Sequence, residues 1–491
     1  MRRRTAELEM KIDGPNDGKS RVCFQLILRR QRIMLGVIGI ILSLGLLMYL
    51  AYRGISVLIL APILALFAGL FVGAPMMATY TEVFMPNLAG YLKTYFPVFL
   101  LGAIFGKVME DSGSAKAIAH AIASKLGKHN AILAVVLSCG VLTYGGVSLF
   151  VVAFAVYPIA AHLFKEAGTP KRLIPGAIAL GSFTFTMTAL PGTPQIQNAI
   201  PMPFFGTTAW AAPILGVISG LLMFVLGTWW LQARAKKANS NGETYGDHPQ
   251  ENIKAFDDSN LPNVWVALSP IVIVLVLNFI IVNYIFVADN PVYEYLQKYK
   301  TTIGAVRGLW SLIVALVIAI IFVIVVDWKR FKDVRGSVNS GVFGSMLPIL
   351  NTASEVGYGN VIKTLSAFAI IQAFMLGISN NPLIAAAIST NVLAGITGSA
   401  SGGMSIALGA MGAQFLQMAN AAHINPQVLH RVVAIACGGL DSLPHNGAVI
   451  TLLGITQLTH KQSYADIGMV SVVIPIIALI VAIILGTMGV V

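Results

Sequence analysis

Five ionisable side chains lie inside or at the ends of long apolar runs: Glu110, Asp111, Glu355, Asp441 and His445. An ionisable group at membrane depth costs about 2.5–3.5 kcal/mol or more, so groups kept there are candidates for function. Asp441 and His445 flank a break within an apolar run, and an imidazole titrates in the physiological pH range. We therefore predict these five residues as proton-coupling groups, with His445 equally able to donate a hydrogen bond to a ligand.

A simpler reading exists for two of these acids. Glu110 and Asp111 close an apolar run, and Lys107 precedes them by one helical turn, so they can form an ion pair where a helix reaches the membrane interface. The remaining histidines considered lie at loop-like positions and are assigned no role: His162, His423, His430 and His460.

Four apolar stretches are interrupted by glycine, proline and small polar residues. They are 131–161 (broken at 143–146), 174–205 (at 190–194), 382–413 (at 398–403) and 432–459 (at 443–447). Non-helical backbone at membrane depth survives only inside protein or beside a water-filled cavity, because each bare N–H or C=O costs several kcal/mol. We therefore expect the four breaks to meet near the midplane. The first and third stretches are predicted as re-entrant hairpins, and the other two as broken helices.

These breaks offer groups that suit an organic anion. Half-helix N-termini present free N–H groups and partial positive charge to a carboxylate, and side chains nearby can bind hydroxyls. The predicted substrate-binding residues are Gly145, Gly146, Ser148, Thr193, Gln195, Asn198, Ser399, Ser401, Gly402, Gly403, Ser405, His445 and Asn446.

Composition identifies the surroundings of these elements. Of 491 residues, 56% are hydrophobic and 11% are charged, whereas a soluble domain carries about 25% charged residues. Lipid must replace water around most of the surface, which predicts an all-α polytopic membrane protein with about 10–12 spans. The clearest uninterrupted spans are 34–50, 55–73, 95–109, 212–231, 264–287, 308–326 and 467–487.

The charge distribution predicts the topology. The net charge of +12 is assigned to cytoplasmic loops facing anionic lipid rather than to nucleic-acid binding. Loops 232–261 and 328–335 are both basic and are separated by two spans, so both are placed in the cytoplasm. Because successive spans cross the membrane in opposite directions, counting back from these loops places the basic N-terminal tail, 1–33, outside. Either residues 75–94 cross once more, or the tail is absent from the mature chain.

Two halves of the chain share motifs in the same order. Residues 109–113 match 354–359, residues 145–149 match 402–406, and residues 189–191 match 442–444, at offsets of 245, 257 and 253. Glycine and proline are common in membrane helices, which is the alternative explanation. We predict an inverted repeat, 95–205 and 339–459, within halves 34–231 and 262–491. Such repeats are typical of secondary transporters.

Residues 106–113, Gly-Lys-Val-Met-Glu-Asp-Ser-Gly, resemble the Gly-Lys-x-x-Glu-Asp-Ser-Gly signature of the gluconate permease (GntP) family, within the ion-transporter superfamily. Residues 398–401 are similar to its Gly-Ser-Ala-Thr hairpin stretch, and the order of elements matches over 34–491. The resemblance implies proton-coupled uptake of gluconate, related sugar acids or hydroxy acids such as 3-hydroxybutyrate. It also implies a transport domain that moves past a scaffold.

Two departures from the family pattern bear on the cargo. The family usually has a Glu in the first hairpin tip, where this chain has residues 144–147, Tyr-Gly-Gly-Val. It often has Pro-His-Pro in the first broken helix, where this chain has Leu-Pro-Gly-Thr-Pro at 190–194. These losses remove polar groups from the expected pocket, which favours a short hydroxy acid over gluconate and leaves the coupling site open.

The leading hypothesis is a secondary active transporter, a proton symporter of a small organic acid, in a bacterial inner (plasma) membrane. A sodium-coupled carboxylate symporter is the alternative, because hairpin tips can offer carbonyl and hydroxyl ligands to Na⁺. A channel is disfavoured by the single long repeat. Enzyme motifs and metal-ligand spacings are absent from the sequence. The expected partners are the organic anion, the coupling ion and lipid, without a cofactor or nucleic acid; a homodimer is left open.

Overall fold

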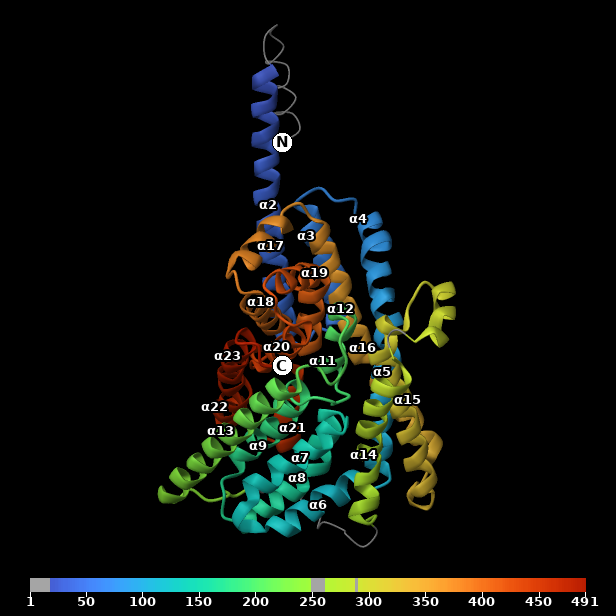
Figure 1. The fold of residues 1–491 in the computed structure, drawn as a ribbon. Coiled ribbons are helices and arrows are strands. Elements are labelled where there is room, and N and C mark those ends of the chain that lie inside the picture. The colour runs from blue at the N-terminus through green and yellow to red at the C-terminus, as the bar shows by residue number, and fades with distance from the viewer. Residues whose placement is uncertain (1–17, 249–260, 288–289) are drawn as a thin grey trace.

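The computed structural model describes residues 18–248, 261–287 and 290–491, and every regular element in these ranges is a helix (Figure 1). Six described helices are long and apolar enough to cross a membrane, or eight if each of two bent pairs is one span. Shorter apolar helices lie between them. The predicted all-α polytopic class is confirmed.

The first half begins with a helix pair and continues through a long helix, a hairpin and a broken helix. In order, these are α2 (Gly18–Tyr52), α3 (Val57–Leu70), α4 (Met76–Ala78), η1 (Thr79–Phe84), α5 (Met85–Asp111), α6 (Ser114–Leu126), η2 (Lys128–Asn130), α7 (Ala131–Tyr144), α8 (Leu149–Glu166), η3 (Lys171–Leu173), α9 (Ile174–Ser182), α10 (Phe185–Thr188), α11 (Ile196–Ala199), α12 (Pro201–Phe205) and α13 (Pro213–Ser240).

The second half has the same order of elements. These are α14 (Val264–Ile280), η4 (Ile281–Ile285), η5 (Pro291–Tyr299), α15 (Ile303–Val326), η6 (Trp328–Arg330), α16 (Val334–Thr364), α17 (Phe368–Gly377), α18 (Pro382–Thr397), α19 (Ala400–Ala421), α20 (Pro426–Cys437), η7 (Leu440–Ser442), α21 (Gly447–Thr456), α22 (His460–Gly468), η8 (Met469–Val473) and α23 (Ile474–Thr487).

The helix ends set the register between the repeats at 253 residues. Helix α5 ends at Asp111 and α16 at Thr364, while α7 ends at Tyr144 and α18 at Thr397. The offsets of 245 and 257 used in two of the three sequence matches are therefore wrong. Glu110, for example, closes α5, whereas Glu355 lies more than two turns before the end of α16, so the two acids are not equivalent.

Helices α5 and α16 cross the molecule antiparallel and pack along each other. Ser337 near the start of α16 donates a hydrogen bond to Asp111 at the end of α5, at 2.6 Å. Gly357 near the end of α16 lies against Phe84, just before α5 begins. The α7–α8 and α18–α19 hairpins accordingly lie toward opposite ends of the molecule (Figure 1), the arrangement expected of inverted repeats.

The helix bounds test two predictions, an extra crossing within 75–94 and a loop at 232–261. An extra crossing within 75–94 is wrong, because Met76–Asp111 is one 36-residue helical segment with a π-helical turn at η1. The predicted loop 232–261 begins as helix, since α13 continues to Ser240, and 249–260 fall outside the described residues, as do 1–17 of the predicted tail. The division into halves 34–231 and 262–491 remains a prediction.

An ion-pair cluster joins η3, α13 and α22. Asp466, on α22 and fully buried, accepts hydrogen bonds from Arg172 and Arg234 at 3.1 and 3.0 Å and from Trp230 at 3.1 Å. Arg172 also makes a bidentate pair with Glu243, at 2.6 and 2.9 Å. The Arg172 hydrogen bonds hold the pKa of Glu243 below its ordinary value.

Substitution of Gly341 by Ala is expected to destabilise the α5–α16 crossing. An added Cβ would lie 2.6 Å from the Ile104 Cα, which is backbone and cannot rotate away. Overpacking of this kind costs about 1–3 kcal/mol, measurable as a lower Tm in detergent. Gly344→Ala on the same helix is the matched control, because its Cβ would meet open space. Equal Tm values for the two variants would contradict this account of the crossing.

Substitution of Asp466 by Asn is expected to cost about 3 kcal/mol, because it leaves two arginines without a buried counter-charge. Glu243→Gln is the control. Its side chain is 41% exposed, so its pair is worth at most about 1 kcal/mol. Because the folded pKa of Glu243 is depressed, that contribution is present above its unfolded pKa and is lost as pH falls through the folded value. Equal losses of thermal stability in both variants would refute this ranking.

Candidate functional site

The second hairpin tip is tied to the break that follows α20. Asn446 donates from Nδ2 to the Gly398 carbonyl at 2.8 Å, and His445 donates from Nε2 to the Gly395 carbonyl at 3.0 Å. The Asn446 Oδ1 also caps α21 by accepting from the backbone N–H of Ala448 and Val449. The break thus supplies donors to the carbonyls that the end of α18 leaves without helical partners.

Hydroxyl groups gather at this second tip. The Ser399 hydroxyl caps α19 by accepting from the Gly402 N–H at 3.1 Å, and it lies 3.5 Å from the Ser401 hydroxyl. Ser401 in turn contacts the Thr352 hydroxyl of α16 at 3.3 Å. Gly403 allows the hairpin helices to approach closely, since an added Cβ would lie 2.2 Å from the Ala394 Cα.

Glu355 faces this tip from α16. Its side chain is 2% exposed, and its Oε2 has no hydrogen-bond partner in the described structure. The carboxyl lies directly against Gly402, where any Cβ would clash with it, and it interacts with the Ser399 hydroxyl. Ser405 and Tyr91 of α5 lie beside each other nearby, and within the described residues neither hydroxyl has a partner at hydrogen-bond geometry.

Asp441 lies in η7, within the break itself. It is 6% exposed, and its Oδ1 accepts from the Ser442 hydroxyl at 3.1 Å. Tyr464 of α22 donates to the Ser442 carbonyl at 3.1 Å, which fixes this segment. In the parts of the chain that the structure describes, neither Asp441 nor Glu355 has an ion-pair partner.

The first hairpin tip is tied to the first break in an analogous way. Tyr144 donates to the Pro191 carbonyl at 2.8 Å, and Gln195 donates to the Thr143 and Val147 carbonyls at 2.8 and 3.3 Å. The N–H of Gln195 lies 3.4 Å from the Thr193 hydroxyl.

Glycines shape this first tip. Gly146 has φ +98°, a left-handed conformation that glycine tolerates best, and its position is closed by Pro194. Gly145 packs against Ile271 of α14, and Ser148, which precedes α8, packs against Gly106 of α5. The tip is therefore enclosed by apolar side chains on the side of α14.

A buried arginine that the sequence analysis did not select connects the two breaks. Arg431 of α20 is fully buried. Its guanidinium donates to the Ala211 carbonyl at 3.1 and 2.7 Å, to the Asn198 side chain at 3.1 Å, and to the Thr188 and Ala209 carbonyls at 3.4 Å each. All of these acceptors lie between residues 188 and 211.

His430 is also buried, contrary to the loop position expected for it. Its ring bonds the Thr207 hydroxyl at 2.6 Å and the Asn198 Oδ1 at 3.2 Å. Asn198 donates to the Thr193 and Ala209 carbonyls, so it links the break to Arg431 and His430. One sequence signal could have placed His430 and Arg431 on a helix. Asn425 followed by a proline is a typical N-cap and first helical position, and α20 begins there.

The two breaks also touch directly. Thr188, at the end of α10, lies against Gly438, where an added Cβ would be 2.8 Å from the threonine methyl. The structure therefore brings together both hairpin tips with their own breaks, and the breaks with each other.

Glu110 and Asp111 lie apart from this cluster of breaks. Lys107 pairs with Glu110 at 3.2 Å and with Asp111 at 2.9 Å, and both acid side chains are 30% exposed. This is the helix-end ion pair of the simpler reading. A coupling role for these two acids remains a prediction.

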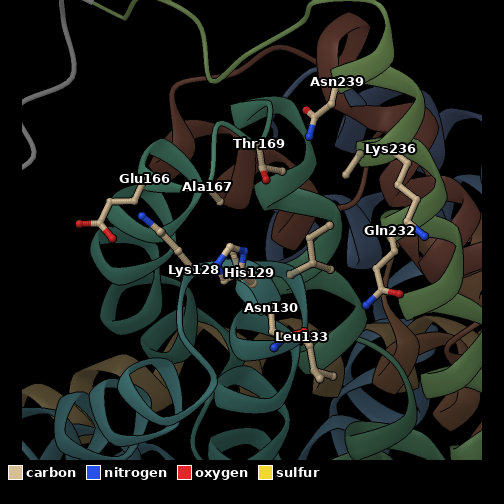
Figure 2. Close-up of a pocket in the computed structure, with 13 residues that line it drawn as sticks. Lys128, His129, Asn130, Leu133, Glu166, Ala167, Thr169, Gln232, Lys236 and Asn239 are labelled. Carbon is tan, nitrogen blue, oxygen red and sulfur yellow. The ribbon is translucent and has the colours of Figure 1, made fainter.

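An open pocket of about 480 Å³ lies elsewhere, where α7 begins and where α8 and α13 end (Figure 2). Lys128, His129, Glu166 and Lys236 line it, at the ends of the hairpin helices opposite to the tip. None of the predicted site residues is among its lining. Within the described ranges, no three His, Cys, Asp or Glu side chains are placed to hold a metal ion.

Comparison with known proteins gives relatives over nearly the whole chain. The transporter YxjC of Bacillus subtilis, which is uncharacterized, is 46% identical over 452 residues, covering 89% of this chain and 96% of the relative. The high-affinity gluconate transporter of Escherichia coli is 23% identical over 476 residues, covering 92% and 99%.

Two solved transporters share the fold. The YdaH transporter of Alcanivorax borkumensis superposes with a TM-score of 0.53 at 15% identity, covering 84% of this chain and 88% of that one. MtrF of Neisseria gonorrhoeae, described as illuminating a class of antimetabolite efflux pumps, gives a TM-score of 0.52 at 12% identity and covers 84% of each.

The family profile described as GntP family permease matches residues 32–488. The chain therefore belongs to the GntP permease family and is a multi-pass membrane transporter rather than an enzyme.

Proposed function

We propose that this permease is a proton-coupled symporter of a small organic acid in a bacterial inner membrane. The observation that carries the proposal is the pair of buried carboxyls at the second tip. Glu355 and Asp441 are 2% and 6% exposed and have no ion-pair partner in the described ranges. A buried carboxyl without a counter-charge is held most readily as the neutral acid, so it can pick up and release a proton.

The proposed substrate class follows from the family and from the tips. The Escherichia coli relative is a gluconate transporter by name, which supports a sugar acid or a related hydroxy acid. The first tip is small and partly apolar, because Gly145 packs against Ile271 and Gly146 against Pro194. That enclosure favours a short hydroxy acid over one with many hydroxyls. The organic anion, lipid and the coupling ion are the proposed partners, and a homodimer remains a prediction.

Sodium coupling is a second candidate, favoured by one observation. The hydroxyls of Ser399, Ser401 and Thr352 lie within 3.5 Å of their neighbours at the second tip. Oxygen ligands of this kind suit a hard cation. Because three hydroxyls alone carry no negative charge, the buried carboxyls make the proton the preferred coupling ion.

The test is uptake of labelled 3-hydroxybutyrate and gluconate into proteoliposomes. A pH difference of one unit across the membrane is worth about 1.4 kcal/mol per proton. Symport with one proton therefore predicts about tenfold accumulation of substrate under that gradient. Glu355→Gln is expected to abolish this accumulation and to retain exchange of labelled for unlabelled substrate. Asp441→Asn and His445→Ala are expected to abolish uptake without loss of membrane insertion. Glu166→Gln, which changes an exposed ion pair with His162, is the control.

The outcomes separate the candidates. Accumulation that follows a sodium gradient at fixed pH would assign sodium coupling instead. Proton-driven accumulation by Glu355→Gln equal to that of the unmodified protein would remove Glu355 from the coupling site. A requirement for ATP would overturn the carrier proposal altogether.

A further inference from the structure

We propose that the substrate's carboxylate binds at the first hairpin tip, 143–148, with Arg431 as its fixed counter-charge. The second tip then serves the coupling ion alone. This inference rests on the proposed function, because it divides the organic anion and the cation between the two repeats. It follows from an asymmetry of charge and of helix capping between two tips that are otherwise equivalent.

The first observation is the location of positive charge. Arg431 is 0% exposed, and every hydrogen bond that the described structure gives it ends on a neutral oxygen. Burying a cation without a counter-ion costs several kcal/mol, which an arriving anion would recover. Arg431 is linked to this tip through Asn198, which accepts from the guanidinium and donates to the Thr193 carbonyl of the adjoining break. Positive potential is therefore directed to this tip.

The second observation is that the hairpin helices are capped differently. At the second tip, Ser399 caps α19 with its own hydroxyl. At the first tip, the equivalent helix is the 18-residue α8, and its N-cap residue Ser148 makes no side-chain cap. The first-turn N–H groups of α8 are thus left for a ligand, together with the positive end of the helix dipole.

The third observation is an unused donor at the same tip. The Thr143 side chain is fully buried, and its hydroxyl has no partner in the described structure. A buried hydroxyl left without a hydrogen bond costs about 1–3 kcal/mol. A carboxylate at the tip would accept this hydrogen bond, so the cost would be recovered when substrate binds.

The second tip has the opposite character. Its nearest buried ionisable group is the carboxyl of Glu355, which lies against Gly402, and Asp441 lies in the adjacent break. A substrate carboxylate placed there would meet acids and hydroxyls, and its helix N-termini are already occupied by Ser399 and Asn446. This tip therefore offers acids that can exchange a proton, and it has no buried cation among the described residues to hold a substrate carboxylate.

The matched pair Ser148 and Ser401 allows a test that needs neither substrate nor transport. They occupy equivalent repeat positions and are both half-buried. Each is changed to Cys in a background with Cys23, Cys139 and Cys437 replaced by alanine. The rates of modification by an anionic and a cationic methanethiosulfonate reagent are then measured. The anionic-to-cationic rate ratio is expected to be at least about fivefold higher at Ser148→Cys than at Ser401→Cys. The buried cation attracts the anionic reagent and repels the cationic one.

Arg431→Gln added to each cysteine variant identifies the source of the field. It is expected to lower the ratio at position 148 at least about threefold and to leave position 401 unchanged. If Arg431→Gln does not fold, the comparison of 148 with 401 in protein retaining Arg431 still decides. Equal ratios at the two positions, or a higher ratio at 401, would overturn the assignment. If the ratios are as expected but the unmodified protein shows no proton-driven uptake, the proposed function is wrong and the charge assignment of the tips still holds.

Discussion

The need to satisfy backbone polar groups away from water governs this structure. Four segments leave the helical conformation inside the protein, and lipid offers them no partners. Each hairpin tip is therefore bonded to its own break by side chains. In the first repeat Tyr144 donates from the tip to the break and Gln195 from the break to the tip; in the second, His445 and Asn446 donate from the break to the tip. These side chains fix the tips, so the groups left over at the tips are the ones free to serve a ligand.

Much of this arrangement could be predicted from the sequence, because its cause is local. Glycine, proline and small polar residues within apolar runs cannot continue a helix, and the four breaks lie where those residues lie. The register between the two repeats was harder to predict from the sequence. Matching glycine pairs placed Gly145 opposite Gly402, whereas the helix ends place it opposite Gly398. Short motifs of common residues do not determine a register, since a shift of four residues keeps them on one helix face.

Arg431 illustrates a different limit. Its burial depends on where α20 begins and on carbonyls more than 200 residues away, at Thr188, Ala209 and Ala211. No local pattern encodes these acceptors, which lie at the end of α10 and in the connection between α12 and α13. These carbonyls satisfy the hydrogen bonds of Arg431, whereas its charge has no counter-ion among the described residues. Glu355 and Asp441, the two buried acids of the second repeat, have no ion-pair partner in the described part of the chain, so the charge is divided between the tips.

Although the two repeats correspond element by element, their hairpins lie at different positions along α5 and α16. Ser148 lies beside Gly106 of α5, whose repeat counterpart is Gly359 of α16, yet Ser401 contacts Thr352, seven residues earlier. Seven residues of helix span about 10 Å. Because α5 and α16 are antiparallel, both tips are displaced toward the end that carries α6. In the described state the two repeats therefore hold their hairpins at different positions along α5 and α16.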